Sequence, residues 1–453
     1  MIDLSLIKKY DVAGPRYTSY PTALQFRELT PDEYRASVAA SDANAPLSVY
    51  CHLPFCATLC YYCACSKVLT RDRSKCTHYL SYLHREIEMQ APLFGDREVT
   101  QLHWGGGTPT FLDDDEVRAL MAHLAANFRF APEREREFSI EIDPRTVDAG
   151  RIRTFRDVGF NRLSFGIQDF DAGVQAAVNR RQSYEDTRDV MRAAREAGFG
   201  SISVDLIYGL PLQSVSSFDE TLEKVIDLSP DRISIYNYAH LPDRFPSQKR
   251  INVIDLPSAD QKLEILKLCI DKLTERGYSH IGMDHFAKPT DELAIAQREG
   301  TLQRNFQGYS TRAECDMVGL GVTSIGRIGN GYAQNAKTIE AYVAALDAGD
   351  LAIRRGVETD DDDALRYAVI MSLICHYALD FGEVEHQFGI NFRDYFAREL
   401  AMLAGFEADE LLTLDARGIY VTDAGRYLIR NICMVFDRYL AKPQAEPRYS
   451  KVI

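Results

Sequence analysis

The chain lacks the features that would place it in a membrane or mark it as disordered. No run of 18 apolar residues occurs in its 453 residues, and the N-terminal stretch MIDLSLIKKYDVAG has no apolar core like that of a secretion signal. Low-complexity tracts and short-period repeats are also missing. Hydrophobic residues make up 46% and charged residues 26% of the chain, as in ordinary globular proteins. We therefore expect a cytoplasmic protein of two or three domains.

Positive charge is in short supply. Lysine and arginine number 52 against 66 aspartates and glutamates, which gives a net charge of -14. A general nucleic-acid binder would normally carry a basic surface, so this class is disfavoured. An anionic substrate would have to be held by a local group of arginines, because the overall field of the protein repels it.

Cysteines are concentrated in one place. Five of the ten lie in the stretch YCHLPFCATLCYYCACSK, where Cys56, Cys60 and Cys63 form a C-x3-C-x2-C pattern. Three thiolates on one short loop can hold three irons of a [4Fe–4S] cluster and leave the fourth iron open to another ligand. Tyr62 places an aromatic ring beside that open iron, where an adenine could stack.

Two other interpretations of the cysteines remain open. A structural zinc site usually needs a second cysteine pair to complete a tetrahedron, and no second C-x2-C pair follows. A disulfide framework is typical of small secreted chains. The iron–sulfur interpretation is favoured, since the remaining cysteines are scattered singly along the chain.

Apolar runs alternate with helical patterns from residue 47 onward. Strands are predicted at 47–52, 100–104, 138–142, 162–166, 201–207 and 232–237, and helices at 75–90, 114–127, 149–158, 184–198, 216–228 and 258–276. This order predicts an α/β fold with a partial TIM-like parallel (β/α)6 barrel, whose ligands lie at the carboxyl ends of the strands.

Four segments follow from this pattern. We predict an N-terminal arm over 1–45, the barrel over 46–285, a less regular extension over 286–356, and a mainly helical C-terminal domain over 357–453. In the last segment, the acidic run Asp360–Asp363 is typical of a helix start, and residues 411–421 are typical of a small hairpin.

A glycine triplet, Gly105–Gly107, follows the second predicted strand. Glycines let a backbone approach a ligand closely, and we expect these to supply N–H donors. The triplet lacks the Lys-Ser/Thr of a phosphate loop, which argues against a nucleoside triphosphatase. His52 and His103 lie within predicted strands, and we interpret them as hydrogen-bonded strand residues rather than iron ligands.

Polar residues stand at or near the ends of the later strands. Glu141 is a carboxylate at a sheet end, where it needs a cationic or hydroxyl partner. It is either half of a structural ion pair or a contact to an ammonium or ribose group. Gln168, Arg180 and Asp205 allow the same two interpretations.

The segment GPRYTSYPTALQF, residues 14–26, is rich in aromatics and turn residues. Its two X-Pro bonds disfavour a helix. It is either an arm packed on the surface or a segment that reaches into a cavity, where Arg16 would present a guanidinium to a carboxylate.

Taken together, the motifs GPRYTSYPT, CHLPFC-x3-C-x2-C-x-C, HWGGGTPT, IEIDP, GFNRLSFGIQDF, DLIYGLP, YNYAHLP, GMDHFA, NFQGY and YAQN resemble the oxygen-independent coproporphyrinogen III oxidase family of the radical S-adenosylmethionine superfamily. The resemblance spans essentially the whole chain. It implies that two propionates of coproporphyrinogen III become vinyl groups, giving protoporphyrinogen IX in haem biosynthesis. It also implies one [4Fe–4S] cluster, two molecules of S-adenosylmethionine, a monomer, and a reductant protein such as flavodoxin or ferredoxin.

The resemblance also implies roles for individual residues. Cys56, Cys60 and Cys63 would hold the cluster, and Cys65 would match an extra cysteine that is not a ligand. The first S-adenosylmethionine would be held by Tyr50, Gly106, Glu141 and Ile325. The second would be surrounded by Tyr62, Gly107, Thr108, Gln168, Arg180, Asp205 and Ala239. Ala64 stands where family members have glycine, which puts the local loop geometry in doubt.

The implied chemistry is radical. A 5′-deoxyadenosyl radical abstracts hydrogen from a propionate β-carbon, and the substrate radical then gives up an electron and CO2. For the substrate carboxylates, the first candidate is Arg16 and the second is Arg304.

Three rival functions remain. A haem-trafficking relative shares the cysteine loop and glycine triplet but lacks GPRYTSYPT and the C-x-C ending at Cys65, both of which are present. A radical methyltransferase would give a methylated tetrapyrrole, and a zinc-binding interaction module would be colourless.

Overall fold

The computed structural model describes residues 4–440. By contacts the chain divides into two compact units. One contains Phe26–Arg276 and Glu314–Glu358, and is called the barrel unit below; the other contains residues up to Gln25, Gly277–Ala313 and residues from Thr359 onward, and is called the second unit. The predicted segment boundaries at 45, 285 and 356 stay predictions, because these units join pieces that are distant in sequence.

Six parallel strands form the centre of the barrel unit. They run in the order β2, β5, β7, β8, β9, β10, with every neighbouring pair parallel. Their bounds are β2 Leu47–Leu53, β5 Glu98–Gly106, β7 Glu137–Ile142, β8 Arg162–Gln168, β9 Ser201–Tyr208 and β10 Arg232–Asn237. The six predicted strands are therefore confirmed, as is the parallel α/β class.

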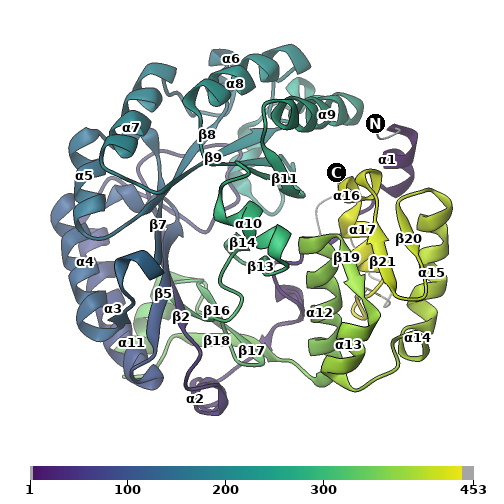
Figure 1. Cartoon of the computed structure of the whole chain (residues 1–453). Helices are drawn as coiled ribbons and strands as arrows, with labels where there is room; N and C mark the ends of the chain where they lie inside the picture. The colour runs from purple at the N-terminus through teal and green to yellow at the C-terminus, as the bar shows by residue number, and fades with distance from the viewer. Residues whose placement is uncertain (1–3, 441–453) are drawn as a thin grey trace. The chain divides into compact units, whose positions relative to one another are not determined.

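The helices that connect these strands are also confirmed, with ends shifted by at most a few residues. They are α3 Arg73–Gln90, α4 Asp114–Asn127, α5 Ala149–Asp157, α7 Tyr184–Glu196, α8 Val215–Leu228 and α9 Ala259–Glu275, with the short α6 Ala172–Ala177 after β8. Figure 1 shows α3, α4, α5 and α7 along the outer side of the strands. Local capping fixes where they begin: Asp113 accepts a hydrogen bond from the N–H of Glu116, and the Glu116 side chain accepts one from the N–H of Asp113.

Strand β2 has a second parallel neighbour from far along the chain. This is β15, Asp316–Leu320, which pairs with β2 so that Gly319 lies opposite Tyr50. The antiparallel strands β16 Ile325–Ile328, β17 Gly331–Asn335 and β18 Ile353–Glu358 continue the sheet, and β1, Arg27–Glu28, adds to its edge. The sequence pattern predicted this region to be irregular and placed no strand before residue 47; both expectations were wrong.

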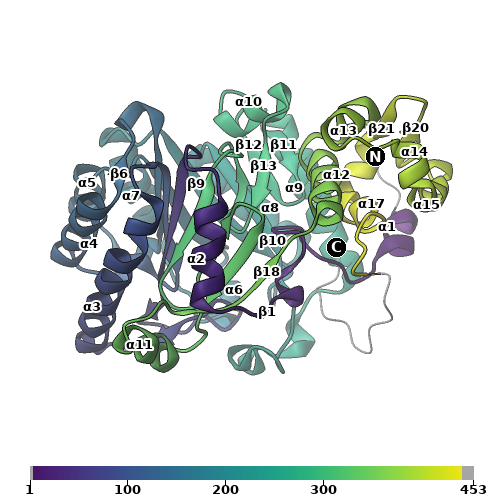
Figure 2. The ribbon, with the colours of Figure 1, turned by 90° about the horizontal axis from the view of Figure 1, so that it is seen from below.

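Two helices complete this side of the barrel unit. Helix α2, Pro31–Ala40, lies beside β18, and α11, Ile339–Asp347, packs on α3. Figure 2 shows α2 along the sheet, where Arg35 forms an ion pair with Asp350. Thr30 and Glu33 form the capping box that starts α2.

The second unit is mainly helical. Its C-terminal part contains α12 Asp361–His376, α13 Phe381–Phe388, α14 Phe392–Tyr395, α15 Ala397–Ala408, α16 Asp423–Tyr427 and α17 Ile429–Met434, with the strands β19 Ala378–Asp380, β20 Leu412–Leu414 and β21 Gly418–Val421. The predicted helix start is confirmed, because Asp360 caps α12. The predicted hairpin is β20 and β21.

The rest of the second unit comes from the earlier segments. It contains α1 Leu4–Tyr10, β11 Ser279–Gly282, β12 His285–Ala287, α10 Glu292–Glu299, β13 Gln303–Asn305 and β14 Gly308–Ser310. The segment 14–26 was predicted to form no helix; this holds for residues 14–22, but Ala23–Gln25 form the short 3-10 helix η1.

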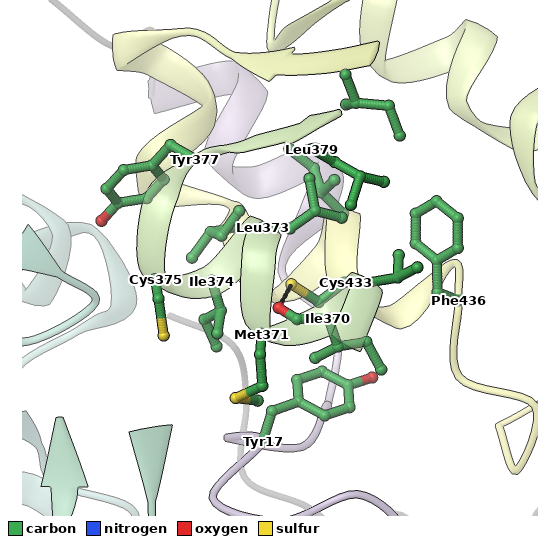
Figure 3. Packing of buried hydrophobic residues seen from close by; sticks show 14 of the residues in the cluster. Tyr17, Ile370, Met371, Leu373, Ile374, Cys375, Tyr377, Leu379, Cys433 and Phe436 are labelled. Carbon is green, nitrogen blue, oxygen red and sulfur yellow. Dashed lines mark hydrogen bonds between the residues drawn. The ribbon is translucent and has the colours of Figure 1, made fainter. Parts of the chain in front are cut away.

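The core of the second unit lies around α12. Figure 3 shows Tyr17 packed with side chains of α12 and with Cys433 and Phe436. Tyr17 is fully buried and donates a hydrogen bond to Asp437 at 3.1 Å. The segment 14–22 is thus built into the hydrophobic core of its own unit rather than lying on the surface.

Candidate active site

The cysteine loop leaves the carboxyl end of β2. Its base is closed by two short parallel strands, β3 Phe55–Cys56 and β4 Val68–Leu69. The N–H of Val68 donates to the carbonyl of Pro54 at 2.7 Å, and the N–H of Thr70 donates to that of Cys56 at 3.0 Å. The backbone therefore holds both ends of the loop, and the three cysteines lie between them.

Hydrogen-bond donors surround the three sulfurs. Thr108 Oγ1 lies 3.2 Å from Cys56 Sγ, and the N–H of Cys65 lies 3.4 Å from Cys63 Sγ. Two guanidiniums point at Cys60 Sγ, from Arg180 at 3.6 Å and from Arg145 at 3.8 Å. Donors and cations are what a thiolate needs once it has lost its proton, so this environment fits cysteines that bind iron. The three are free cysteines.

The pKa values of the thiols differ within the loop. The hydrogen bond from Cys65, opposed by burial and supported by Lys67, lowers the pKa of Cys63 to about 6. Burial raises the pKa of Cys56 to about 11, although Thr108 opposes the shift. Hydrogen bonding thus favours the thiolate form of Cys63, whereas burial disfavours the thiolate form of Cys56 until a metal binds.

Within residues 4–440 no cluster of three or more histidine, cysteine, aspartate or glutamate side chains is arranged to hold a single metal ion.

Asp143, an acidic residue that directly follows β7, positions the two guanidiniums. Asp143, after β7, forms ion pairs with Arg145 at 2.6 Å and Arg180 at 3.3 Å. Burial would raise the pKa of Asp143, but the charges of both arginines lower it below its ordinary value. Asp143 therefore holds two cations against Cys60, an arrangement that depends on residues 37 positions apart and has no local signature.

The glycine triplet lets the end of β5 pack closely against the base of the cysteine loop. Gly106 has φ +116, a conformation that other residues rarely adopt, and a Cβ on Gly107 would lie 2.5 Å from the backbone of Pro54. The prediction that these glycines offer N–H donors to a ligand stays a prediction, and in this structure two of the N–H groups have partners within the chain. The N–H of Gly106 donates to Glu141 at 3.1 Å, and that of Gly107 donates to the carbonyl of Leu53 at 2.9 Å.

Glu141 has the polar partner that its position at the end of β7 requires. His103 Nε2 lies 3.3 Å from Glu141 Oε1, and His103 Nδ1 lies 2.6 Å from Ser139 Oγ. Burial would raise the pKa of Glu141, but His103 and the N–H of Gly106 lower it below its ordinary value. The Glu141 side chain is nevertheless 44% exposed, so an ionised carboxylate remains accessible to a ligand.

The residues assigned to the first S-adenosylmethionine lie close to one another. The ring of Tyr50 stacks on His103 with centroids 5.8 Å apart, and its hydroxyl lies 3.1 Å from His52. Ile325 begins β16, and its backbone lies against Gly319, which pairs with Tyr50. These residues occupy the carboxyl ends of β2, β5 and β7 and the adjacent antiparallel strand.

The residues assigned to the second S-adenosylmethionine come from the other strand ends. Gln168 ends β8 with φ +71, a strained conformation for a residue with a side chain. Arg180 donates to the carbonyl of Gly166, while its Nε has no hydrogen-bond partner within residues 4–440. Burial and the charge of Glu141 raise the pKa of Asp205 to about 7, although hydrogen bonds from serines oppose the shift.

One glutamine that sequence reasoning missed joins two of these residues. Gln248 is buried, and its Nε2 donates to the carbonyl of Tyr62 at 3.1 Å and to that of Ala239 at 3.2 Å. Ala239 follows β10, so Gln248 ties the cysteine loop to the end of the last barrel strand. Beside it, Ser247 donates to the carbonyl of Cys63.

The predicted substrate arginines lie in the second unit. Arg16 forms an ion pair with Asp284, and Arg304 donates from Nε to the carbonyl of Arg16 at 3.1 Å. Burial and the nearby Arg16 lower the pKa of Arg430 to about 9. Arg304 and Arg430 are buried, whereas the Arg16 side chain is 32% exposed. Arg16 is therefore better placed to meet a solute than Arg304.

Comparison with known proteins agrees with this geometry. Residues 50–225 match the family model described as the radical SAM superfamily, and residues 359–428 match that of the HemN C-terminal domain. The chain is 52% identical, over 454 residues, to the oxygen-independent coproporphyrinogen III oxidase of Pseudomonas aeruginosa, covering 100% of this chain and 98% of the relative. The chain belongs to the oxygen-independent coproporphyrinogen III oxidase family.

Other members of the family are similarly close. The Escherichia coli K12 relative is 49% identical over 451 residues, covering 100% of this chain and 98% of the relative. The solved structure of the Escherichia coli coproporphyrinogen III oxidase, described as a radical SAM enzyme, matches with a TM-score of 0.92 at 49% identity, covering 97% of this chain and 99% of that one. The chain is thus a radical SAM oxidoreductase, and the family's cofactors are a [4Fe–4S] cluster and S-adenosylmethionine.

Within residues 4–440, no helix is both long enough and apolar enough to cross a membrane.

Proposed function

We propose that this protein converts coproporphyrinogen III to protoporphyrinogen IX under anaerobic conditions in haem biosynthesis, by oxidative decarboxylation of two propionates to vinyl groups. The observation that carries the proposal is the full-length identity to oxidases of that name, in a chain whose loop holds three cysteines among hydrogen-bond donors. When bound, the cluster supplies one electron that cleaves S-adenosylmethionine to a 5′-deoxyadenosyl radical.

The site residues of the barrel unit then have the following roles in holding the cofactors. Cys56, Cys60 and Cys63 bind the cluster, and the hydrogen bond from Cys65 lowers the pKa of Cys63. Glu141, held ionised by His103, receives the ammonium group of the first S-adenosylmethionine. The other contacts to it come from Tyr50, Gly106 and Ile325.

A second S-adenosylmethionine is proposed at the remaining strand ends. Arg180 offers the unpartnered Nε and suits a carboxylate, while Asp205 within β9 suits a ribose hydroxyl. Its further contacts are Tyr62, Gly107, Thr108, Gln168 and Ala239. Positioning matters here, because a misplaced primary radical would attack the protein itself.

Substrate carboxylates are proposed to meet Arg16. Arg16, Arg304 and Arg430 bring three guanidiniums together beside Asp284. A propionate would meet the exposed part of Arg16 through charge-assisted hydrogen bonds. Because Arg304 is buried, we place it behind Arg16 as a positioning residue.

The setting of the reaction follows from the cofactor. An oxidisable cluster requires a reducing compartment, so we place the enzyme in the cytoplasm. We propose that the enzyme works as a monomer, as the family resemblance implies. The electron comes from a reductant protein such as flavodoxin or ferredoxin, and a one-electron acceptor takes the electron released with each CO2.

Anaerobic reconstitution tests the proposal. Protein loaded with iron and sulfide, given dithionite, S-adenosylmethionine and coproporphyrinogen III, should release two CO2 per substrate, form protoporphyrinogen IX and accumulate 5′-deoxyadenosine. Cys63→Ser should abolish all three products, because a ligand is lost. A methylated tetrapyrrole would instead indicate a methyltransferase, and haem binding without product would indicate a trafficking protein; either outcome would overturn the proposal.

A further inference from the structure

The surface around the cysteine loop is rich in exposed cations. Arg71, Arg181, Lys249 and Arg250 are exposed, and within residues 4–440 none of them forms an ion pair with a carboxylate. Elsewhere in the barrel unit, arginines such as Arg129 and Arg134 are paired with a nearby glutamate. These four cations keep their charge exposed on a protein of net charge -14, although exposed carboxylates such as Asp72 and Glu185 are near two of them in sequence.

Either the cation itself or the residue before it in sequence contacts the cysteine loop. The Arg250 guanidinium lies 5.5 Å from the ring centroid of Tyr61, and Lys249 follows Gln248, which holds Tyr62. Arg71 follows Thr70, whose N–H donates to Cys56. Arg250 thus contacts the loop itself, and the other three cations directly follow residues that contact it.

Arg181 is placed through the residues before it. Asn179 donates to the carbonyl of Leu59 at 2.8 Å, and Arg180 contacts Cys60 Sγ. Arg181 itself points to a pocket rather than to the sulfur. We call Arg71, Arg181, Lys249 and Arg250 the cationic patch.

A pocket of about 670 Å³ lies beside the patch. Its lining includes Arg145, Gln175, Arg181, Gln182, Ser183 and Asp186, so cations and neutral polar groups outnumber the one carboxylate. Arg145 joins this pocket to the site, because its guanidinium also lies 3.8 Å from Cys60 Sγ. One side chain thus separates a solvent-accessible hollow from a cluster ligand.

We propose that the cationic patch and this pocket are the docking surface for an acidic one-electron carrier protein, of the flavin or iron–sulfur class, which reduces the cluster. The inference rests on the proposed function, since it requires a cluster at the loop. In the step, the carrier is oxidised by one electron and the cluster is reduced by one, with no bond made or broken.

The charges explain why a local patch is needed. An acidic carrier is repelled by the overall negative charge of this protein, so encounter depends on a surface where the sign is reversed. Electron-transfer complexes are small and weak, and complementary charge supplies much of their association rate and orientation. Docking at the patch would bring the carrier to Cys60 rather than to the amino ends of the strands.

Binding of oxidised flavodoxin, measured by titration calorimetry at low salt, tests the inference apart from catalysis. Arg181→Glu/Lys249→Glu should weaken binding about tenfold or more and flatten its salt dependence. The matched control Arg129→Glu/Arg134→Glu reverses the same number of charges at the amino ends of the strands and should bind within about twofold of the parent. Equal weakening by both pairs, or by neither, would overturn the inference.

Activity then separates the two proposals. With dithionite as the reductant, the patch variant should form protoporphyrinogen IX at the parent rate; with reduced flavodoxin it should be slower by about the loss in binding. If the parent itself makes no product with dithionite, the proposed function fails while the binding result still stands. A patch variant that is slow with dithionite as well would contradict a docking role.

Two measurements on the unaltered protein guard against a variant that does not fold. Carbodiimide cross-linking, which joins carboxylates to amines, should link flavodoxin to Lys249 in preference to other lysines. A single-stranded oligonucleotide should not displace flavodoxin at equal concentration. Cross-links spread over distant lysines, or displacement by the oligonucleotide, would show a nonspecific anion surface and overturn the inference.

Discussion

Glu86 is a fully buried carboxylate without a cationic partner in the contacts it makes. Its Oε2 accepts hydrogen bonds from the N–H of Gly321 and the hydroxyl of Tyr342, both at 2.6 Å. Its Oε1 accepts from Asn335 at 2.6 Å and from Gln90 at 2.9 Å. Burial raises the pKa of Glu86, although these four donors oppose the shift. The carboxylate therefore gathers the loop after β15 and the end of β17 around one point.

Glu86→Gln should lower the free energy of unfolding by about 2 kcal/mol, because an amide turns an N–H group toward donors that need an acceptor. Urea denaturation followed by circular dichroism measures the change. The exposed neighbour Glu88 gives the control, and Glu88→Gln should change stability by less than about 0.5 kcal/mol. Equal effects of the two substitutions would contradict this account.

Asp205 makes the stability of the ligand-free protein depend on pH. Burial and Glu141 raise its pKa to about 7, so between about pH 4 and pH 7 the folded protein holds a proton that the unfolded chain has released. Stability then falls as pH rises through this window. Asp205→Asn removes the titrating carboxyl group. The free energy of unfolding of the variant, relative to that of the parent, should therefore rise by about 1 kcal/mol or more between pH 5 and pH 8. If the free energies of unfolding of the parent and the variant changed equally with pH across this range, the pKa of Asp205 would be an ordinary one.

The link between β5 and the cysteine loop depends on how closely two backbones approach. A Cβ at position 107 would meet the backbone of Pro54, which cannot move without displacing the loop base. Gly107→Ala should therefore reduce the iron and sulfide bound after anaerobic reconstitution by about fivefold or more, as measured by metal analysis and visible absorbance.

Gly405, in α15, supplies the matched control for Gly107. Nothing lies within 4 Å of a Cβ added there, so Gly405→Ala should leave cluster content unchanged and raise stability by about 0.5–1 kcal/mol. Full cluster content in Gly107→Ala would show that the loop base tolerates displacement.

Elements differ in how well the sequence predicts them. The strands β2, β5, β7, β8, β9 and β10 are largely apolar runs between capped helices, a pattern set by local burial, and all six were predicted. Strands β15 to β18 were missed because their glycines are typical of turns. In the structure Gly326 and Gly356 permit close contact between neighbouring strands: a Cβ on Gly356 would lie 2.1 Å from the carbonyl of Tyr332.

At the scale of the whole chain, the site also has a part that the sequence predicts and a part that it does not. The cysteine spacing is local, so the cluster loop was readable from the sequence. The partners that tune it are not local: His103 meets Glu141, and Gln248 meets Tyr62 across 186 positions. Strand register and loop packing decide these contacts, and neither is encoded in a short motif.

Most of the hydrophobic core of the barrel unit lies outside the cysteine loop. Among its largest fully buried side chains, Trp104 and Phe165 lie on barrel strands and Tyr79 on α3, whereas Phe55 lies at the base of the loop. Removal of iron with a chelator and reductant should therefore leave far-UV circular dichroism within about 10% of the loaded protein, with cooperative unfolding retained. Proteolysis should become faster within residues 56–67. Loss of cooperativity, or binding of a hydrophobic dye, would show that the cluster holds the core together.

The partnership of β2 with β15 sets an order of events during synthesis. The strand that supports the cysteine loop gains its second neighbour only when residues 316–320 have left the ribosome. Until then the loop emerges from an unfinished sheet edge, with its thiols open to oxidation or to stray metal. Iron–sulfur assembly should therefore act on released chains, and a pause in translation before residue 316 should yield a polypeptide that cannot be metallated.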